Sequence, residues 1–424
     1  MKIFSFIVQS SAAKFIIIDI TDAMQRLGHE TNFFDFDTFF VKHQNLNDKD
    51  KYTKLGEIIL QIRNFQPDII FGYGLEYFSQ MFTSFICDLQ ASLYDLLKMP
   101  CLNLLFDFGE PFHPYKKPET EDDIKIFKDL QNSDNLFFCW DKVAVDIMKK
   151  CGVLKTHFFP MAVNERNFYK FEPDNKLIEQ YGSDIIFIGG PTPERIAALE
   201  TLAGLNLKIF GYDSEKWLAN EKLKKCYSGQ LNKQNIIRGA YNVSKISINV
   251  TREHGFASLN MRVYEAMACG NLMLTDDKSD ARELFAENEE IIIFRDYNDL
   301  KNKTEYFLAH KDQLNNIANA GRNRVLKEHT YLKRFENYLP IIVKFLRENI
   351  ALKKISDIII SEPKKAEAYL KSDFLKNEIS YNKDNMYFLF AQLYHNSGDT
   401  KKRDIYRKKV FEINPLHYNS LELI

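Results

Sequence analysis

Short apolar runs alternate, over about the first 150 residues, with longer segments in which apolar residues recur every three or four positions. The short runs are typical of buried strands, and the periodic segments are typical of helices that pack on one side. The pattern predicts strands at 2–8, 31–36, 68–71, 101–106 and 135–139, and helices at 15–28, 55–65, 82–98 and 142–151. Such an alternation predicts a doubly wound parallel sheet.

A second series of the same kind runs from 185 to about 321. The stretch 163–184 before it is polar and irregular, and we interpret it as a linker. A long helix is expected at 330–349. We therefore expect an α/β protein with two Rossmann-like parallel-sheet domains and a helical C-terminal extension. The predicted boundaries are 1–165 for the N-terminal domain, 166–330 for the second domain, 331–350 for the long helix and 351–424 for the extension.

The most informative segment is 258–275, which predicts a helix followed directly by a buried strand. Ser258 is a favourable N-cap and Gly270 a favourable C′ residue. Arg262 and Glu265 lie three positions apart and therefore share a face of this helix. A cation and a carboxylate near a helix N-terminus suit a nucleotide diphosphate, whose phosphates are attracted there. The alternative is an intrahelical ion pair worth roughly 0.2–0.5 kcal/mol.

The same residues resemble a known family. The pattern Ser258-x-Asn260-x-Arg262-x-x-Glu265-Ala266, followed by Ala268-Cys269-Gly270, resembles the donor-site signature of GT-B glycosyltransferases, and most of all their CgeB-like branch. Further matches in the right order occur at 187–190 with Arg195, at 207–211, at 241–249, at 320–322 and at 328–331. The resemblance covers about 185–340, while the N-terminal half matches loosely, near 106–111 and 139–141.

The resemblance implies two Rossmann-like domains that face a cleft, with the long helix crossing back onto the first domain. It also implies transfer of a sugar from a nucleotide-diphosphate donor to an acceptor hydroxyl. In that family Glu265 would accept hydrogen bonds from the ribose, and Arg262 would face the phosphates. Two other functions stay open: a GT-B domain that serves only as a binding scaffold, and a GT-B sugar-nucleotide epimerase.

One departure from the family concerns stereochemistry. Many retaining GT-B enzymes carry two glutamates eight positions apart, and the second corresponds to Glu265. The first position is occupied by Ala257 here. A retaining reaction is therefore in doubt, and Ser258, His254 or Asn260 could take over part of the missing hydrogen bonding.

Further donor-side candidates follow predicted strands, where open α/β sheets bind ligands. Gly189 and Gly190 would let the backbone approach a phosphate, although a Gly-Gly pair is also common in plain turns. Arg195 opens the next helix. By analogy with the family, the segment 228–231, with Gly229 and Gln230, faces the nucleobase. Arg252 and His254 come between a strand and the helix of the signature.

The acceptor side is less well defined. Inverting transfer needs a general base within hydrogen-bond reach of the acceptor hydroxyl. Asp107, Glu110 and His113 follow a buried strand of the first domain and are the candidates there, with His254 on the donor side. The sequence contains no Asp-x-Asp pair in the context of a metal–nucleotide site. We therefore expect no metal and no cofactor, and the nucleotide sugar would be a co-substrate.

Composition limits the partners. The net charge of −1 gives no indication of nucleic-acid binding. No run approaches about 18 consecutive apolar residues, so no membrane span is expected. The six scattered cysteines suit reduced thiols in the cytoplasm.

The C-terminal extension has its own pattern. Residues 385–415 resemble one tetratricopeptide repeat, with two helices around Gly398-Asp399 and a closing Asn414-Pro415. One repeat cannot bury its own apolar face, so it should stack on neighbouring helices. Two roles stay open: a structural cap, or an arm that binds a protein, either the acceptor or a partner subunit.

Overall fold

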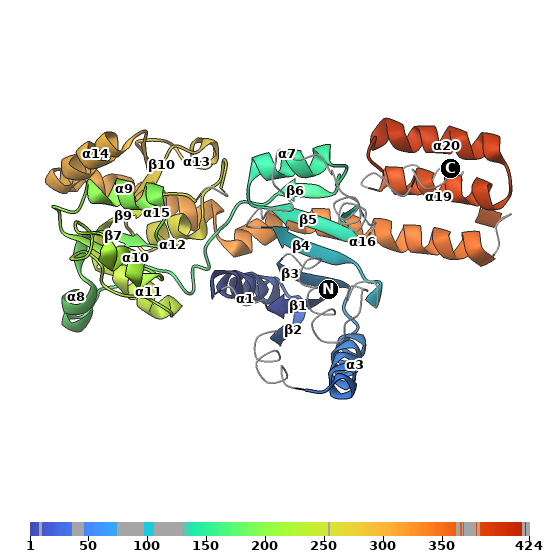
Figure 1. Cartoon of the computed structure of the whole chain (residues 1–424), viewed down its shortest axis with the longest axis horizontal. Coiled ribbons are helices and arrows are strands. Elements are labelled where there is room, and N and C mark those ends of the chain that lie inside the picture. Colours follow the sequence, from blue (N-terminus) through green and yellow to red (C-terminus); the bar gives the residue numbers. More distant parts are fainter. Residues whose placement is uncertain are drawn as a thin grey trace. The chain divides into compact units, whose positions relative to one another are not determined.

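The computed structural model describes residues 1–7, 11–35, 46–73, 97–105, 130–131, 134–252, 255–361, 365–366, 368, 379, 382–417 and 420 (Figure 1). The chain divides into two compact units. The first comprises Met1–Phe158 and Asn337–Ile424, and the second comprises Phe159–Glu336. Each unit contains one parallel sheet, so the expectation of two Rossmann-like sheets is confirmed.

The first sheet has the strand order β2-β1-β3-β4-β5-β6, and all its neighbours are parallel. Its strands are β1 (Lys2–Ile7), β2 (Glu30–Asp35), β3 (Ile69–Tyr73), β4 (Cys101–Leu105), β5 (Asn135–Cys139) and β6 (Thr156–Phe158). Helices α1 (Ser11–Arg26), α3 (Asp48–Phe65) and α7 (Lys142–Lys150) connect strands. All residues of β4 and β5 are buried, as expected for a parallel sheet covered on both faces.

Alternate residues of β1 show how both faces are covered. Phe4 and Phe6 belong to a core with Ile58 and Ile62 of α3. Ser5, which points to the opposite face, has its hydroxyl 3.4 Å from that of Thr21 in α1. The two helices therefore pack on opposite faces of this sheet.

The second sheet has the order β11-β10-β9-β7-β8, again parallel throughout. Its strands are β7 (Ser183–Ile188), β8 (Leu207–Phe210), β9 (Ser244–Asn249), β10 (Leu272–Asp276) and β11 (Ile292–Phe294). The helices of this unit are α8 (Asn175–Tyr181), α9 (Pro193–Glu200), α10 (Ser214–Ala219), α11 (Gln234–Asn242), α12 (Met261–Ala268), α13 (Ser279–Leu284), α14 (Tyr297–Ala309) and α15 (Lys311–Glu328). Ile185, Ile246 and Leu274 of three adjacent strands belong to its buried core.

Several predicted elements differ from the structure, and helix α1 begins at Ser11 and ends at Arg26 where 15–28 was predicted. The expected linker at 163–184 contains α8, which begins at the N-cap Asp174 but has no fully buried residue, so no apolar period marks it. Helix α3 begins at Asp48, because its first two turns are largely polar and Asn47 caps them. The short strand β6 was not predicted. Of the predicted helix 82–98, only the last two residues lie within the described ranges.

The long helix α16 (Tyr331–Ser361) continues past the predicted end at 349. Its last turns carry Leu352, Ile355 and Ile359, which are buried in a core shared with Phe390 and Tyr394. The predicted boundary at 350 therefore falls inside a helix. The apolar residues of these turns are covered by the C-terminal extension, which the local pattern did not reveal.

Helices α19 (Lys383–Asn396) and α20 (Thr400–Ile413) form a hairpin in the extension. Gly398 between them has φ +76°, which favours glycine. Asp399 caps α20 by accepting a hydrogen bond from the Lys402 amide at 3.1 Å. The two helices and the Gly-Asp turn are confirmed, whereas assignment to the tetratricopeptide class stays a prediction.

Buried polar contacts join this hairpin to the first sheet's unit. Lys155 Nζ donates to Asn382 Oδ1 at 2.8 Å, and Asn414 Nδ2 donates to the Gly152 carbonyl at 2.9 Å. Burial lowers the pKa of Lys155 to about 8, while Asp384, Asp134 and Glu348 act in the opposite direction. The inner side of the extension is therefore part of the N-terminal unit, which supports the role of a structural cap.

We predict that Lys155→Ala destabilises the protein by roughly 3–5 kcal/mol, because the buried carboxylates around it would lose their cation. Urea unfolding measures the loss. Lys150→Ala, at an exposed position at the end of α7, is the matched control and should change little. Equal effects of the two variants would show that the cluster around Lys155 contributes nothing particular.

His329 sits in a buried polar contact within the second unit. Its Nε2 lies 3.2 Å from the Leu284 carbonyl, and its Nδ1 lies 2.9 Å from a guanidinium nitrogen of Arg334. A neutral ring that donates from Nε2 and accepts at Nδ1 satisfies both contacts. Burial, and then the charge of Arg334, lower the pKa of His329 to about 3.

The unfolded chain takes up this proton near pH 6.5, whereas the folded protein stays neutral until about pH 3. We therefore expect the free energy of unfolding to fall as the pH decreases through this window. Between pH 6.5 and 4.5 the residue should account for roughly 2–3 kcal/mol. His329→Gln retains an acceptor and a donor but does not titrate, so unfolding at several pH values should show a flatter acid dependence. A variant with the wild-type slope would refute the assignment.

Candidate functional site

Polar side chains gather at the carboxyl ends of β9 and β10, the edge where open α/β sheets bind ligands. Asn249 ends β9, and its Nδ2 donates to Thr275 Oγ1 at 2.9 Å. Thr251 donates to the Asp276 carboxylate from its amide at 3.2 Å and from its hydroxyl at 3.0 Å. These contacts fix the ends of two neighbouring strands relative to each other.

The same network sets the start of α12. Asn260 caps this helix, because its Oδ1 accepts from the Arg262 amide at 3.0 Å while its Nδ2 donates to Asn249 Oδ1 at 2.6 Å. The prediction that Ser258 is the N-cap is therefore wrong. An amide side chain can accept and donate to two partners at once, as this position requires, and Ser258 is instead buried two residues earlier. Gly270 follows α12 with φ +93°, so its C′ role is confirmed.

Arg262 and Glu265 both lie on α12, but they do not form the ion pair that was the alternative. Arg262 forms no ion pair with any residue in the described ranges. Glu265 is 8% exposed. The pKa values of Tyr241 and Cys269 are raised mainly by their own burial, and next by the negative charge of Glu265. The carboxylate of Glu265 therefore lies near these two groups.

Arg195 is the buried cation of the site, 3% exposed. Its Nε donates to the Val250 carbonyl at 2.9 Å, and one terminal nitrogen donates to the Gly190 carbonyl at 3.0 Å. The guanidinium also lies over the Phe187 ring, 5.6 Å from its centre. Carbonyls after β7 and β9 thus hold it at the carboxyl edge.

Burial, followed by the positive charges of Arg262 and Arg252, lowers the pKa of Arg195 to about 9, whereas Asp276 and Glu194 act in the opposite direction. We call Arg195, Arg252 and Arg262 the arginine cluster. None of the three forms an ion pair with a carboxylate of the described residues, and Arg195 bonds to backbone carbonyls instead. The site is therefore electrostatically suited to an anion.

The glycines after β7 have close neighbours of their own. A Cβ on Gly190 would lie 2.2 Å from the Tyr212 ring, and one on Gly189 would lie 2.9 Å from the Phe187 ring. The neighbour of Gly189 is the ring of the buried Phe187, whereas that of Gly190 is the outer end of an exposed tyrosine ring, so the role of these glycines toward a phosphate stays a prediction. Tyr212 itself is 44% exposed, and the Arg252 guanidinium lies 5.5 Å from the centre of its ring.

The structure brings most donor-side candidates to one edge of the sheet. Gly229 has φ +100°, and its carbonyl accepts from the Gly211 amide at 2.9 Å, next to Tyr212. Gln230 and Arg252 are exposed. Four candidate catalytic residues, Asp107, Glu110, His113 and His254, lie outside the described residues.

Sequence reasoning missed Thr251 and Tyr212 as members of this site. The available signal was a polar or aromatic residue directly after an apolar run, which is where a parallel strand ends at the binding edge.

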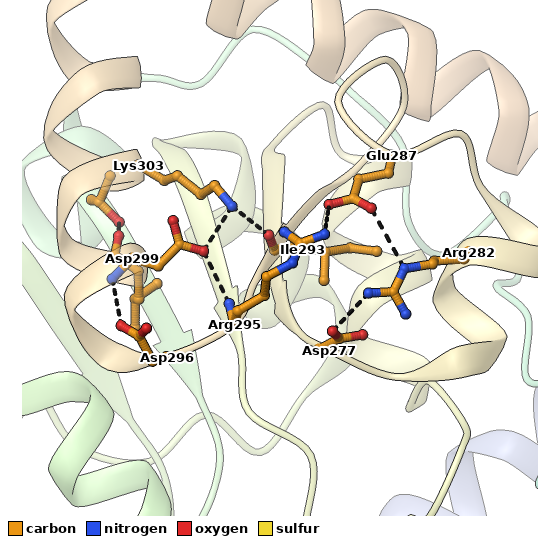
Figure 2. A network of polar contacts seen from close by, with 10 residues as sticks. Asp277, Arg282, Glu287, Ile293, Arg295, Asp296, Asp299 and Lys303 are labelled. Atoms are coloured by element: carbon orange, nitrogen blue, oxygen red, sulfur yellow. Dashed lines mark hydrogen bonds and ion pairs between the residues drawn. The ribbon is translucent and has the colours of Figure 1, made fainter.

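The next strand ends of this sheet carry a different arrangement, shown in Figure 2. Asp277 pairs with Arg282 at 2.7 Å, and Glu287 pairs with Arg295 at 2.9 Å. Lys303 contacts Asp299 and the Ile293 carbonyl. Here each cation has a carboxylate, unlike in the arginine cluster. The adjacent residues Asp276 and Asp277 engage different partners, as expected for neighbouring side chains of an extended segment.

Within the described ranges, no three His, Cys, Asp or Glu side chains are grouped so that they could hold a metal ion. None of the helices searched there is long and apolar enough to cross a membrane.

Comparison with solved structures identifies the fold. A glycosyltransferase from Rickettsia africae is 16% identical, with a TM-score of 0.56 over 81% of this chain and 98% of its own. The Anabaena protein HepE in complex with UDP-glucose is 12% identical, with a TM-score of 0.58 over 81% and 99%. Sucrose-phosphate synthase from Thermosynechococcus elongatus is 13% identical, with a TM-score of 0.56 over 81% and 99%. The chain has the GT-B fold.

The family comparison is consistent with this fold. A family model described as "Glycosyl transferase-like" matches residues 194–340, which include Arg195, Arg252, Arg262 and Glu265. No curated protein sequence matches the chain significantly.

We predict that Asn260→Ala destabilises the protein by about 1–3 kcal/mol, because α12 loses its cap and the side-chain oxygen Oδ1 of Asn249 loses its donor. Urea unfolding measures the change. Gln230→Ala, at an exposed position of the same edge, should stay within about 0.5 kcal/mol. A neutral Asn260→Ala variant would contradict the assignment of the cap.

Proposed function

We propose that the chain is a glycosyltransferase that moves a sugar from a nucleotide-diphosphate donor to an acceptor hydroxyl. The observation that carries the proposal is the arginine cluster at the carboxyl edge of the second sheet, because its three cations form no ion pair with a described carboxylate and Arg195 bonds to backbone carbonyls. A nucleotide diphosphate would supply the missing negative charge. The match of residues 194–340 to a glycosyltransferase-like family supports the same conclusion.

Within this proposal, Arg195 and Arg262 contact the diphosphate. Arg195 uses Nε and one terminal nitrogen for backbone carbonyls, so further N–H groups of its guanidinium remain for phosphate oxygens. Arg262 lies in the first turn of α12, where the helix dipole also favours an anion. Charge-assisted bonds from arginine to phosphate are among the strong hydrogen bonds.

Glu265, one turn further along α12, would accept from the ribose hydroxyls. The base would lie near Gly229 and Gln230, and the exposed Tyr212 ring borders the same loop. Because HepE was solved with UDP and with UDP-glucose, uridine diphosphate is the first nucleotide to test.

Contacts to the sugar would differ from those of enzymes with two glutamates. Ala257 is buried and supplies no carboxylate. Both ends of the Asn260 amide are engaged, with Asn249 and with the Arg262 backbone, so Asn260 is poorly placed to replace a glutamate. Ser258 is 1% exposed. Of the three substitutes considered, the proposal retains His254.

The chemistry would need no divalent metal, because arginines and a helix N-terminus can stabilise the departing diphosphate. The general base for the acceptor would be Asp107, Glu110, His113 or His254. The acceptor would be a protein or a surface glycan, and the C-terminal hairpin offers an outer side on which a partner could dock.

A second candidate function is a binding scaffold that retains the nucleotide site without transfer. The observation in its favour is Ala257 in place of a glutamate. Nucleotide binding without any release of nucleoside diphosphate from a panel of nucleotide sugars would favour this second function.

We predict that UDP, titrated calorimetrically in the presence of a chelator, binds the wild-type chain. Arg262→Ala and Glu265→Ala should each weaken binding by roughly 1–3 kcal/mol, because each leaves a polar or charged ligand group unpaired. Arg262→Lys should also weaken binding, since lysine lacks the planar fork.

Arg282→Ala is the matched control, because Arg282 is paired with Asp277 and Glu287 in the neighbouring network. It should leave the affinity unchanged. Unchanged affinity in folded Arg262→Ala and Glu265→Ala variants would refute the donor-site assignment. Binding that appears only when magnesium or manganese is added would refute the metal-free proposal.

A further inference from the structure

Helix α20 concentrates positive charge. Its 14 residues contain six lysines and arginines against two carboxylates, Asp404 and Glu412, whereas the whole chain has a net charge of −1. Val410 is its one buried residue among those described. The helix lies along α19, as Figure 1 shows, and leaves most of its own surface exposed.

The charges of α20 are divided between two sides. Asp404 is engaged by Arg403 at 2.8 Å and by Arg407 at 3.7 Å. At 100° per residue, four lysines and Ile405 project to the other side, and Glu412 lies at the C-terminal end of that side. We call Lys401, Lys402, Ile405, Lys408 and Lys409 the lysine face.

Two aromatic rings contact the ammonium groups of two lysines of this face. Lys402 lies 4.8 Å from the centre of the Tyr394 ring, and Lys409 lies 4.9 Å from that of Tyr406. The two tyrosine rings stack on each other with centres 5.6 Å apart. The ammonium groups of these two lysines are therefore positioned by the protein itself, and that of Lys402 also lies 3.5 Å from the Asp399 carboxylate.

The lysine face is arranged as two pairs seven residues apart, about 10 Å along the helix. Ile405, 55% exposed, lies between the pairs. Lys401 and Lys408 are exposed and take part in no ion pair with the described residues. Cations that surround an exposed apolar side chain suit a particular kind of surface. Its negative charges need no fixed spacing, and an apolar layer lies beneath them.

We propose that the lysine face docks the protein onto a membrane surface that contains anionic lipids. The contact is peripheral: the lysines lie among the headgroups, and Ile405 enters the interfacial layer. The attraction depends on salt, because it acts between exposed charges. This docking is independent of the donor chemistry and would place the enzyme at acceptors that are held at a membrane.

The test uses the full chain and sedimentation with two kinds of vesicle. One contains phosphatidylcholine alone, and the other contains seven parts phosphatidylcholine to three parts phosphatidylglycerol. We expect binding to the anionic vesicles at an ionic strength of about 0.1 M, and its loss near 1 M, where the Debye length falls to about 3 Å. Equal binding to both vesicles, or binding to neither, overturns the proposal.

A double variant, Lys401→Gln with Lys408→Gln, should bind the anionic vesicles roughly thirtyfold more weakly, at about 1 kcal/mol for each lysine. The control is Lys225→Gln with Lys327→Gln, which removes two exposed lysines elsewhere and should change binding less than twofold. Both double variants should retain the wild-type melting temperature and nucleotide affinity. An equal loss in the two variants would mean that net charge, not the lysine face, determines binding.

An acidic peptide and heparin serve as competitors for the other anionic partners. Capture by either of them without vesicle binding would assign the lysine face to a protein or to a glycan instead, and would overturn the lipid proposal.

Discussion

The second unit must hold a buried arginine, Arg195, at the carboxyl edge of its parallel sheet, and the arrangement of the site depends on this requirement. Arg195 loses water there, and the carbonyls of Val250 and Gly190 replace only part of its hydration. Two further arginines add to the cost. A structure tolerates such a group when the rest of the fold fixes it, and here the strand ends, Phe187 and the loop glycines do so. Bringing an anion to this edge would relieve the cost, which links the local stability of the site to its proposed ligand.

The polar network beside it fixes the start of α12 through hydrogen bonds within the protein itself. Asn249, Asn260 and Thr275 connect two strand ends to the first turn of α12 through direct hydrogen bonds. The direction of that helix, and with it the position of Arg262, follows from these bonds. Preorganised donors at a site of developing charge need no rearrangement during a reaction. The neighbouring network around Glu287 contrasts with it, because there the charges neutralise one another.

The C-terminal extension joins two roles that the sequence left as alternatives. Its inner side belongs to the N-terminal unit, through Lys155, Asn382 and Asn414. Its outer side carries the lysine face, where Lys401 and Lys408 form no ion pair with the described residues. A helix that is both anchored on one side and charged on the other can serve as a cap and as a docking surface at the same time.

The sequence by itself determined the two parallel sheets and the helix that carries Arg262 and Glu265. Apolar runs and helical periods are set by residues that are close in sequence, so they can be read from the sequence directly. It did not determine Asn260 as the cap, the length of α16 or the role of Tyr212. Each of these depends on a partner distant in sequence: Asn249 for the cap, the core around Phe390 for the last turns of α16, and Gly190 for the tyrosine ring. Helix α8 was not predicted for a different reason: it buries no residue fully, so its sequence shows no apolar period. The charge balance of the arginine cluster was likewise decided by tertiary structure, because only folding brings residues 195, 252 and 262 close enough for their charges to act on one another.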